Sequence, residues 1–546
     1  MKSSLVISLF LTLPVWSQTP PPVPPPIRPG AIASHIRFLA DDLLEGRETG
    51  SRGFEIAARY VAAQLASFGL QPAGDDGSYF QHIRFRSSKL VAPRCTFVIH
   101  DGKRDVALEV KKDFLLRPGF LNDNDEITAP LVFAGYGITA PELKHDDYAS
   151  IRANGKIVVV ISGAPSTFAN DQRAYYSGGL VKEQIAAEHG AIGVIALRSN
   201  ADEARYSFEK SARQSDMASM RYLDAAGRPA DTLPQVRANG SISRSGAKLL
   251  FVRAPMTPEQ LLADAEKNIA HSFPLNVSAT IRTVSTFAEA ASENVLATLP
   301  GSNPERRNEY VVVSAHLDHL GDHGNGSDRI HNGAYDNASG IAAMLEISRA
   351  FTSLPQPPER SMLFVALTGE EKGEQGSEYL ASHPPIGGTI VADINMDMFL
   401  MLFPAKDLVA LGGEHTSLGA VAREAAESVG LTISPDPIPE EVRFIRSDQY
   451  SFVKEGVPAI SLKTGSTSAD PAIDGDKVTK EWLRTIYHTP KDDMNQPFDW
   501  ATGVKYAQTN FLIAWAAANG AQRPAWTAGD FFGEKFGSVP GGPASR

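Results

Sequence analysis

The sequence predicts an α/β protein with a mostly parallel central sheet flanked by helices and a smaller, β-rich α/β domain inserted into it. From Asn294 onward, apolar strand-like runs alternate with segments of helical periodicity. Such alternation favours a parallel sheet that is covered on both faces. A second set of apolar strands precedes this region, and 546 residues are enough for two or three domains.

The first residues predict a leader and a linker. Lys2 gives a positive end, residues 5–15 are apolar, and the small Ser17 is suited to a cleavage point. We therefore expect a signal peptide over residues 1–17, then a proline-rich, extended linker over residues 18–30. The apolar stretch is too short for a membrane span. These features predict a secreted or periplasmic protein without a stable membrane anchor.

Composition excludes some classes of partner. The hydrophobic fraction of 42% and the charged fraction of 21% are ordinary for a globular protein. The formal net charge of -11, without a basic run, does not favour a nucleic acid as partner. The single cysteine, Cys95, cannot form an intrachain disulfide. Nothing in the composition indicates the oligomeric state.

The elements preceding the main strand–helix alternation fall into two parts. Residues 31–120 are assigned to the first part of the main domain, where residues 57–68 have helical spacing and Gly69 ends the run. Residues 43–50 before this helix are expected to form a polar loop. Residues 121–287 are assigned to the inserted domain. Its expected strands are 131–137, 156–161 and 190–197, and its expected helix is 182–189.

Residues 288–520 are assigned to the second part of the main domain. The expected strands are 310–315, 361–367, 390–394 and 457–462, and the expected helices are 339–351, 418–429 and 500–518. The remaining residues, 521–546, are rich in glycine and proline and are expected to be loose.

Acidic and histidine residues gather in five clusters at or just after these strand-like runs. In chain order they are His316 with Asp318, then Asp336, then Glu370 with Glu371, then Asp397, then Tyr487 with His488. An open α/β sheet collects its catalytic groups at strand ends. Histidines and carboxylates without cysteine suit zinc or a similar divalent ion. The clusters therefore predict a hydrolase that uses metal-activated water.

Each cluster alone is weak evidence, because a lone acidic residue after a strand is usually a turn residue or a helix cap. Five clusters at successive strand ends are hard to produce by capping alone. His316 and Asp318 lie two apart and face the same side of a strand. His316 can thus bind a metal while Asp318 orients its ring, although the pair could also be a hydrogen bond within the core.

The acidic residues allow several roles. Ser339 fits the cap of the following helix better than Asp336, which frees Asp336 to bridge two metals. The side chains of Glu370 and Glu371 diverge, so that one can bind metal while the other is a general base. An exposed Glu–Glu pair in a loop is the alternative. Asp393 and Asp397 lie four apart, and local spacing does not decide between them.

The histidines need the same sorting. His488 lies between Tyr487 and Pro490 in a polar loop, which suits a rigid ligand. Three other histidines, namely His319, His323 and His331, are expected to be loop residues.

These segments resemble the M28 family of zinc aminopeptidases, from Asn294 to about Asn519 together with the helix near Ala57. The motifs that carry the resemblance are SAHLDHLG at 314–321, DNASG at 336–340, GEE at 369–371, NMDM at 395–398, RSDQYSF at 446–452 and YHTP at 487–490. The inserted region resembles a protease-associated domain. The resemblance implies a zinc-exopeptidase fold of the phosphorylase/hydrolase-like type.

The resemblance also implies a role for each residue. His316 and Asp397 would hold one zinc ion, Glu371 and His488 a second, and Asp336 would bridge them through a segment with a cis peptide bond to Asn337. The family pattern selects Asp397 over Asp393. Glu370 would be the general base, Asp318 would orient His316, and Tyr487 would stabilise the oxyanion. Two zinc ions per chain are implied.

Two positions depart from the family pattern. Tyr335 precedes the bridging aspartate, and Gln449 stands where many relatives have histidine. Neither is a ligand, so the departures concern the substrate pocket. The resulting hypothesis is a secreted dizinc aminopeptidase that acts on peptide substrates. The alternatives are a carboxypeptidase or a glutaminyl-cyclase-like enzyme on the same fold, or an inactive protein that binds partners through its inserted domain.

Overall fold

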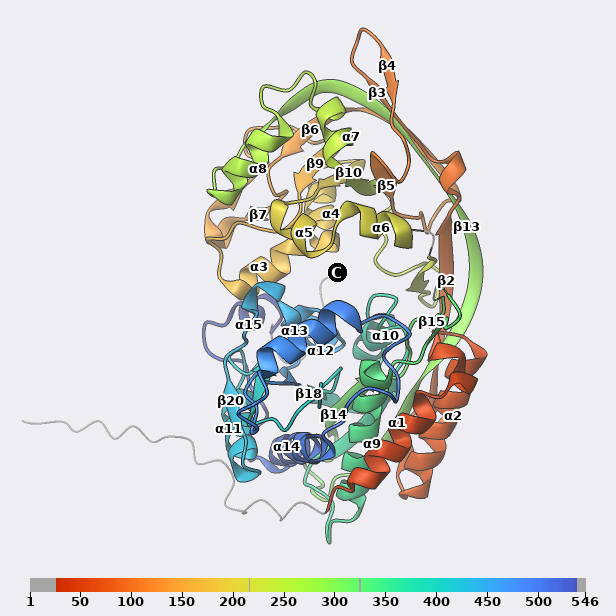
Figure 1. The fold of residues 1–546 in the computed structure, drawn as a ribbon, viewed down its shortest axis with the longest axis vertical. Coiled ribbons are helices and arrows are strands. Elements are labelled where there is room, and N and C mark those ends of the chain that lie inside the picture. Colours follow the sequence, from red (N-terminus) through yellow and green to blue (C-terminus); the bar gives the residue numbers. More distant parts are fainter. Residues whose placement is uncertain (1–25, 216, 324–325, 538–546) are drawn as a thin grey trace, which may run out of the picture.

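The computed structural model describes residues 26–215, 217–323 and 326–537, which form two lobes, one above the other in Figure 1. The predicted signal peptide at 1–17 and most of the predicted linker at 18–30 lie outside the described residues. No helix of the described ranges is long and apolar enough to cross a membrane.

The lower lobe contains the main sheet, and its centre is parallel. Four strands pair in parallel in the order β17 (Ser361–Leu367), β14 (Glu309–His316), β18 (Thr389–Asn395) and β21 (Ala459–Thr464). On one side, β13 (Ser272–Leu299) pairs antiparallel with β17, β1 (Gln71–Pro72) and β2 (Phe80–Leu90). On the other side, β19 (Asp407–Leu411) pairs antiparallel with β21 and in parallel with β20 (Thr432–Ser434). The predicted α/β class with a mostly parallel sheet is confirmed.

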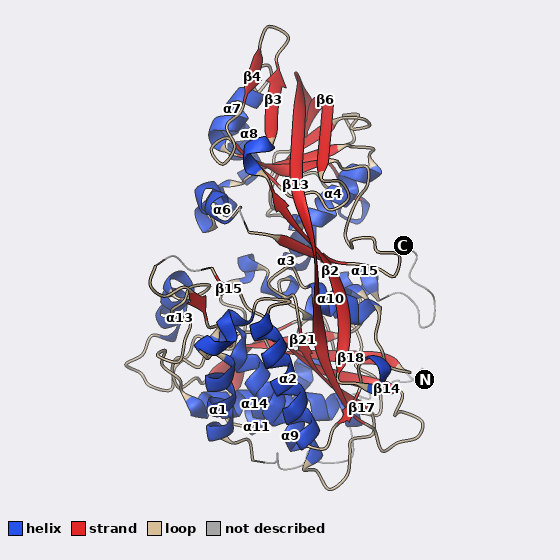
Figure 2. Ribbon diagram, turned by 90° about the vertical axis from the view of Figure 1, so that its right-hand side faces the viewer, coloured by secondary structure: helices blue, strands red, loops and turns tan. Residues whose placement is uncertain are grey.

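Helices cover both faces of this sheet. The larger core lies under α1 (Pro29–Leu39), α2 (Arg52–Ser67), α9 (Ser339–Thr352), α11 (Leu418–Ser428) and α14 (Trp500–Asn519), which gather on one side in Figure 2. The opposite face packs on α10 (Gln375–Ser382) and α12 (Gln449–Lys454) through the buried Leu380 and Phe452. A further helix, α13 (Gly475–Thr485), precedes α14.

The upper lobe has a separate mixed sheet and its own apolar core. Its strands are β3 (Thr96–His100), β4 (Asp105–Ala107), β5 (Phe114–Leu116), β6 (Asn124–Ala134), β9 (Ile157–Ile161), β10 (Gly193–Leu197) and β12 (Ala238–Ile242). Its helices are α3 (Asn170–Ser177), α4 (Gly179–Glu188), α5 (Asn200–Arg205), α6 (Phe208–Gln214), α7 (Arg244–Leu250) and α8 (Pro258–Glu266). Short strands complete the chain: β7 (Thr139–Ala140) with β8 (His145–Asp146), β15 (Gly321–Asp322) with β16 (Ile330–His331), and β11 (Ser219–Tyr222) against β2.

One strand runs through both lobes. The first half of β13 pairs with β6 and β3 in the upper sheet, and the second half pairs with β2 and β17 in the lower sheet (Figures 1 and 2). The boundary placed at residue 287 therefore falls inside a continuous strand. The boundary placed at residue 121 also differs from the structure, because β3, β4 and β5 already belong to the upper sheet.

The predicted loose tail is packed where the structure describes it. Helix α15 (Phe531–Phe536) follows Trp526, and Phe532 is fully buried with Phe444 and Val453. Asp530 caps the helix by accepting a hydrogen bond from the backbone N–H of Gly533. The aromatic side chains of this segment pack in an apolar cluster, and their burial orders the segment despite its glycine and proline content. Residues 538–546 lie outside the described part of the chain.

Candidate metal centre

The predicted site residues meet at the carboxyl ends of the parallel strands. His316 is the last residue of β14, the two glutamates follow β17, Asp397 follows β18, Asp336 precedes α9, and His488 lies between α13 and α14. Parallel strands bring their carboxyl ends to one edge of the sheet. The geometry thus collects in one place residues that are 172 positions apart at the extremes, His316 and His488.

Asp336 lies between two histidine–carboxylate pairs. Its Oδ1 atom is 3.3 Å from Nε2 of His316, and that nitrogen is also 3.3 Å from Oδ1 of Asp397. Its Oδ2 atom is 3.2 Å from Nε2 of His488, and that nitrogen is 3.4 Å from Oε2 of Glu371. Each oxygen of Asp336 therefore faces a different histidine with a different second carboxylate.

These spacings fit ligands around metal ions. Zinc binds nitrogen and oxygen at about 2.0–2.2 Å in tetrahedral geometry, which places two ligand atoms on one ion about 3.3–3.4 Å apart. The four nitrogen–oxygen distances, 3.2–3.4 Å, match that separation. The donor set of imidazole nitrogen and carboxylate oxygen suits zinc and related divalent ions. The residues present therefore fit two adjacent metal ions that share Asp336.

The segment that carries Asp336 is fixed by its side chains and neighbours. The peptide bond between Asp336 and Asn337 is cis, as the resemblance implied. The Asn337 amide donates to the carbonyl of Met396, and its oxygen accepts from the backbone N–H groups of Gly340 and Met398. Asn337 thus ties the bridging aspartate to the segment that carries Asp397.

Asp318 connects His316 to the tandem glutamates. Its backbone carbonyl lies 3.1 Å from Nδ1 of His316, so the main chain orients the imidazole. Its carboxylate instead accepts the backbone N–H groups of Glu370 at 3.1 Å and Glu371 at 3.3 Å, and the Thr49 hydroxyl at 2.9 Å. The sequence predicted that Asp318 orients His316, and in the structure the carbonyl of Asp318, rather than its carboxylate, lies beside the imidazole.

Glu370 and Tyr487 have strongly shifted acidities. Burial raises the pKa of Glu370, and the neighbouring charges of Glu371 and Asp448 add to this rise against the opposing effect of His316. Burial also raises the pKa of Tyr487, so its hydroxyl remains protonated and can donate a hydrogen bond. The ring of Tyr487 stacks on His488 with centroids 3.8 Å apart. Shifted acidities of this kind gather at functional sites.

Sequence reasoning missed four supporting residues. Arg47, in the segment predicted to be a polar loop, is fully buried and donates to the carbonyls of Leu317, Asn332 and Gly333. The other three, Asp492, Lys463 and His319, contact Asp336, Asp397 and Glu371 respectively. Periodicity does not point to them, because each acts across a large separation in sequence, and His319, although it lies within the motif at 314–321, was expected to be only a loop residue.

His319 lies outside the named helices and strands, as expected of a loop residue, but it is buried at the centre. Asp393 and Asp397 differ in their partners. His319 is fully buried at the centre, whereas His323 is half-exposed and bonds Glu48, and His331 lies within 3.2 Å of the Gly321 carbonyl. Asp393 accepts from the Ser314 hydroxyl at 2.7 Å inside the sheet. Asp397, in contrast, lies beside His316.

The two departures from the family pattern are both structural neighbours of the centre. Tyr335 is buried, stacks on Phe498 and donates its hydroxyl to the Pro497 carbonyl. Gln449 accepts from Asn395 at 2.7 Å and donates to the Phe444 carbonyl at 2.6 Å. Asn395 is the last residue of β18, so Gln449 supports the strand end that leads to Asp397.

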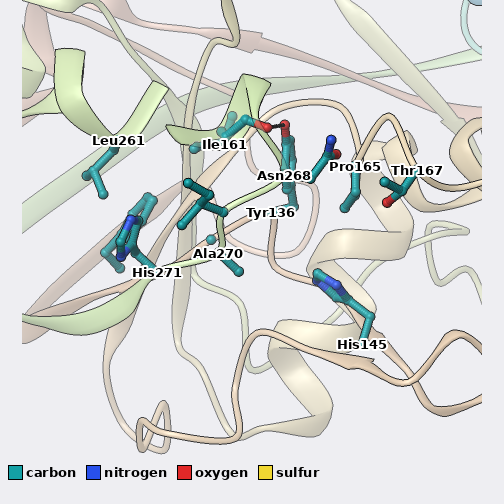
Figure 3. A pocket seen from close by; sticks show the side chains of 13 residues that line it. Tyr136, His145, Ile161, Pro165, Thr167, Leu261, Asn268, Ala270 and His271 are labelled. Atoms are coloured by element: carbon teal, nitrogen blue, oxygen red, sulfur yellow. Dashed lines mark hydrogen bonds between the residues drawn. The ribbon is translucent and has the colours of Figure 1, made fainter. Parts of the chain in front are cut away.

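A pocket in the upper lobe is separate from this centre. Tyr136, His145, Asn268 and His271 contribute its polar groups, and Leu261 and Ile161 are among its apolar walls (Figure 3). None of the eight predicted site residues lines it. The candidate chemistry therefore belongs to the lower lobe.

The fold and the site together define an α/β domain with a carboxylate–histidine centre built for divalent metal. Residues 294–514 match the profile of Peptidase family M28, so this part of the chain is a domain of that family. The match includes all the residues of the centre that lie beyond β13.

Several related proteins match parts of the chain. Aminopeptidase YwaD of Bacillus subtilis is 26% identical over 216 residues, which cover 38% of this chain and 41% of that protein. A probable zinc metalloprotease of Pyrenophora tritici-repentis is 34% identical over 264 residues, which cover 42% of this chain and 58% of that protein. The chain thus spans about half the length of these relatives.

A solved structure matches nearly the whole chain. The aminopeptidase from Aneurinibacillus sp. strain AM-1 superposes with a TM-score of 0.50 over 91% of this chain and 95% of that one, at 21% sequence identity. This likeness supports the two-lobed fold and carries no statement about substrate.

Proposed function

We propose that the protein is a dizinc aminopeptidase that removes N-terminal residues from peptides. The observation that carries the proposal is Asp336, whose two oxygens face two different histidine–carboxylate pairs at distances that suit ligands of two ions. The M28 domain and the aminopeptidase and zinc metalloprotease relatives support the same reading.

Five residues would hold the ions. His316 and Asp397 would bind one, His488 and Glu371 the other, and Asp336 both. When bound, such ions lower the pKa of a water molecule to near neutral and polarise the carbonyl that is to be cleaved.

The protein's own residues supply the proton transfer and the stabilisation of charge. Glu370 follows directly on β17 beside Glu371 but makes none of the four ligand-like contacts. It would accept the proton of the attacking water and pass it to the leaving amine. Tyr487, kept protonated by burial, would donate a hydrogen bond to the developing oxyanion.

Two alternatives are less well supported. A single-metal, cyclase-like centre would leave one of the two histidine–carboxylate pairs without a role, yet both pairs have ligand-like spacing. An inactive binding protein would be expected to lack some of these residues, and all five ligand candidates are present and converge. A carboxypeptidase has the same centre and is separated only by its substrate.

The remaining assignments are also proposals. We infer that the protein is exported, from its predicted signal peptide, and that the upper lobe is a protease-associated domain. Peptides are the proposed substrates, and no feature supports a nucleic acid.

A substrate panel tests the function. Amino-acid arylamides and short peptides, each with a free or a blocked N-terminus, would be incubated with the protein in the presence and absence of a chelator. We expect cleavage only of substrates with a free N-terminus, and loss of activity with chelator. Cleavage from the C-terminus would establish the carboxypeptidase, cyclisation of N-terminal glutamine would establish the cyclase, and no turnover of any substrate would favour a binding protein.

A further inference from the structure

The two non-bridging carboxylates of the centre share an arrangement. In Glu371, Oε2 faces His488 at 3.4 Å while Oε1 lies 2.7 Å from Nδ1 of His319. In Asp397, Oδ1 faces His316 at 3.3 Å while Oδ2 lies 3.0 Å from Nζ of Lys463. Each carboxylate therefore presents one oxygen to a candidate metal position and has its other oxygen held by a donor.

We propose that His319 and Lys463 are positioning residues that reserve the outer oxygen of Glu371 and Asp397, so that each carboxylate binds its ion through one oxygen only. The inference rests on the proposed dinuclear centre and adds to it a pair of residues that set the coordination number.

The length of its contact with Glu371 distinguishes His319 from the proposed metal ligands. Atoms bound to one zinc ion lie about 3.3–3.4 Å apart, whereas a charge-assisted N–H···O hydrogen bond measures about 2.7–2.9 Å. The His319–Glu371 separation of 2.7 Å belongs to the second class. An ionised carboxylate only accepts hydrogen bonds, so Nδ1 of His319 is the donor.

The surroundings of His319 allow little movement. The residue is fully buried, and a Cβ atom on Gly333 would lie 2.7 Å from its ring. The backbone of Gly333 therefore packs directly against the imidazole, which fixes the direction of Nδ1. Because a side chain at position 333 would clash with the imidazole, only glycine fits there, just before the segment of Asp336.

Lys463 serves the other carboxylate from a neighbouring strand. It lies on β21, which pairs with β18, and its ammonium also donates to the backbone carbonyl of Asp397. An ammonium has three donors and no lone pair, so Lys463 in this state cannot be a ligand. It holds both the side chain and the main chain of Asp397.

The consequence concerns free coordination positions. A catalytic metal needs an open position beyond its protein ligands. If the outer oxygens were released, each carboxylate could bind through both oxygens and occupy that position. Removing the hydrogen-bond partner of a metal ligand typically lowers metal affinity or activity by roughly 10–100-fold.

The test uses two substitutions at each position. His319→Asn keeps an N–H donor near the place of Nδ1 and His319→Ala removes it; Lys463→Arg keeps a cation and Lys463→Met removes it. Zinc affinity of metal-free protein would be measured by competition with a chromophoric chelator. The visible absorption of cobalt-loaded protein would report coordination number, because the bands weaken as that number rises.

We expect the Ala and Met variants to bind one ion roughly 10–100-fold more weakly and to show weaker cobalt bands. The Asn and Arg variants should recover most of both properties. His331→Asn and Lys454→Met, which change a buried histidine and a paired lysine outside the ligand set, should behave as the unmodified protein. Thermal unfolding of each metal-free variant checks that it is folded.

Two results would overturn the inference. If His319→Ala and His319→Asn both lose one ion completely, as His488→Ala should, His319 is itself a ligand. If the Ala and Met variants keep unchanged affinity and unchanged cobalt spectra, neither residue positions a ligand. Failure of the unmodified protein to bind two ions would instead refute the dinuclear centre, so the two failures are distinguishable.

Discussion

The carboxylate of Asp492 holds the backbone of Asp336, with Oδ2 accepting the N–H of Asp336 at 3.0 Å. Its Oδ1 accepts the preceding N–H, that of Tyr335, at 2.9 Å. Asp492 itself lies four residues after His488, and its N–H donates to the Thr489 carbonyl. One buried side chain thus links the proposed bridging ligand to the loop of a proposed terminal ligand.

Replacing Asp492 should disturb both the segment of Asp336 and the loop that carries His488. In Asp492→Asn, one of the two N–H groups of the Tyr335–Asp336 segment would face an amide that cannot accept from it. We expect metal affinity to fall roughly 10–100-fold, measured by chelator competition. The matched control is Asp493→Asn, because the carboxylate of Asp493 accepts hydrogen bonds from Asn495, two residues further on, and should tolerate the change. Equal affinities for both variants would contradict the role given to Asp492.

Variants of the two tandem glutamates should differ in metal content. Glu370→Gln should retain both ions and lower kcat by about 10²–10⁴-fold, the usual effect of losing a general base. Glu371→Gln should bind one ion more weakly, because a neutral amide is a poorer ligand, and added zinc should partly restore its activity. Elemental analysis with kcat decides the matter. A reversed pattern would exchange the two roles, and near-normal turnover in both would refute the mechanism.

Tyr487 should matter for turnover more than for binding. Tyr487→Phe keeps the ring that stacks on His488 and removes only the hydroxyl. If that hydroxyl stabilises the oxyanion, kcat should fall about 10²–10³-fold, the range for loss of one such donor. Zinc content and KM should change little. A loss confined to KM would place the tyrosine in substrate binding instead.

Two metal equivalents should be needed for full activity. Stepwise addition of zinc to metal-free protein, followed by rate and elemental measurements, tests this count. Ligands that bind only the folded state add stability, by about 4 kcal/mol at a concentration 1,000 times the Kd. Chelation should therefore lower the free energy of unfolding as well as the rate. Full activity with one ion per chain would favour the single-metal alternative.

The contact between the N-terminal segment and α9 should weaken in acid. Glu346, fully buried, lies 2.8 Å from both Arg28 and Arg349. Burial raises its pKa, but the donors on these arginines outweigh burial and lower it to about 2. A depressed folded-state pKa adds stability above the unfolded value of about 4.5, and this stability is lost as pH falls toward 2.

Glu346→Gln tests this dependence through the free energy of unfolding in urea. At pH 7 the variant should be less stable by about 1.5–3 kcal/mol, the range for hydrogen bonds to a charged group. The difference from the unmodified protein should shrink as pH falls below 4.5. A difference that stays constant down to pH 3 would show that the ionised carboxylate is not its source.

The parallel sheet was predictable because each of its strands contains an apolar run. The strand expected at residues 361–367 is β17, and the helix expected at 339–351 corresponds to α9, which is one residue longer. Buried parallel strands read as continuous hydrophobic runs bounded by turn residues. The clusters after β14, β17 and β18 were visible for the same reason, since each follows an apolar run, whereas Asp336 precedes α9 and His488 lies between α13 and α14.

What escaped prediction depends on contacts distant in sequence. Strand β13 alternates buried and exposed residues through much of its length and carries charged groups in its middle, so no apolar run marks its 28 residues. Arg47 and His319 look like ordinary polar residues, because their burial comes from packing against segments far along the chain. The local sequence pattern does not indicate partners that are distant in sequence.

The path of β13 bears on the order in which the two lobes can fold during synthesis. The upper sheet is complete once residues up to about 284 have emerged, whereas α1 and α2 pack on α9, α14 and the far half of β13. Helices α1 and α2 therefore lack these packing partners until most of the chain has been made, while the lobe encoded between them and their partners can fold earlier. We therefore expect the proposed catalytic centre to assemble after the upper lobe, and a chain truncated before α14 to carry a folded upper lobe and an incomplete lower one.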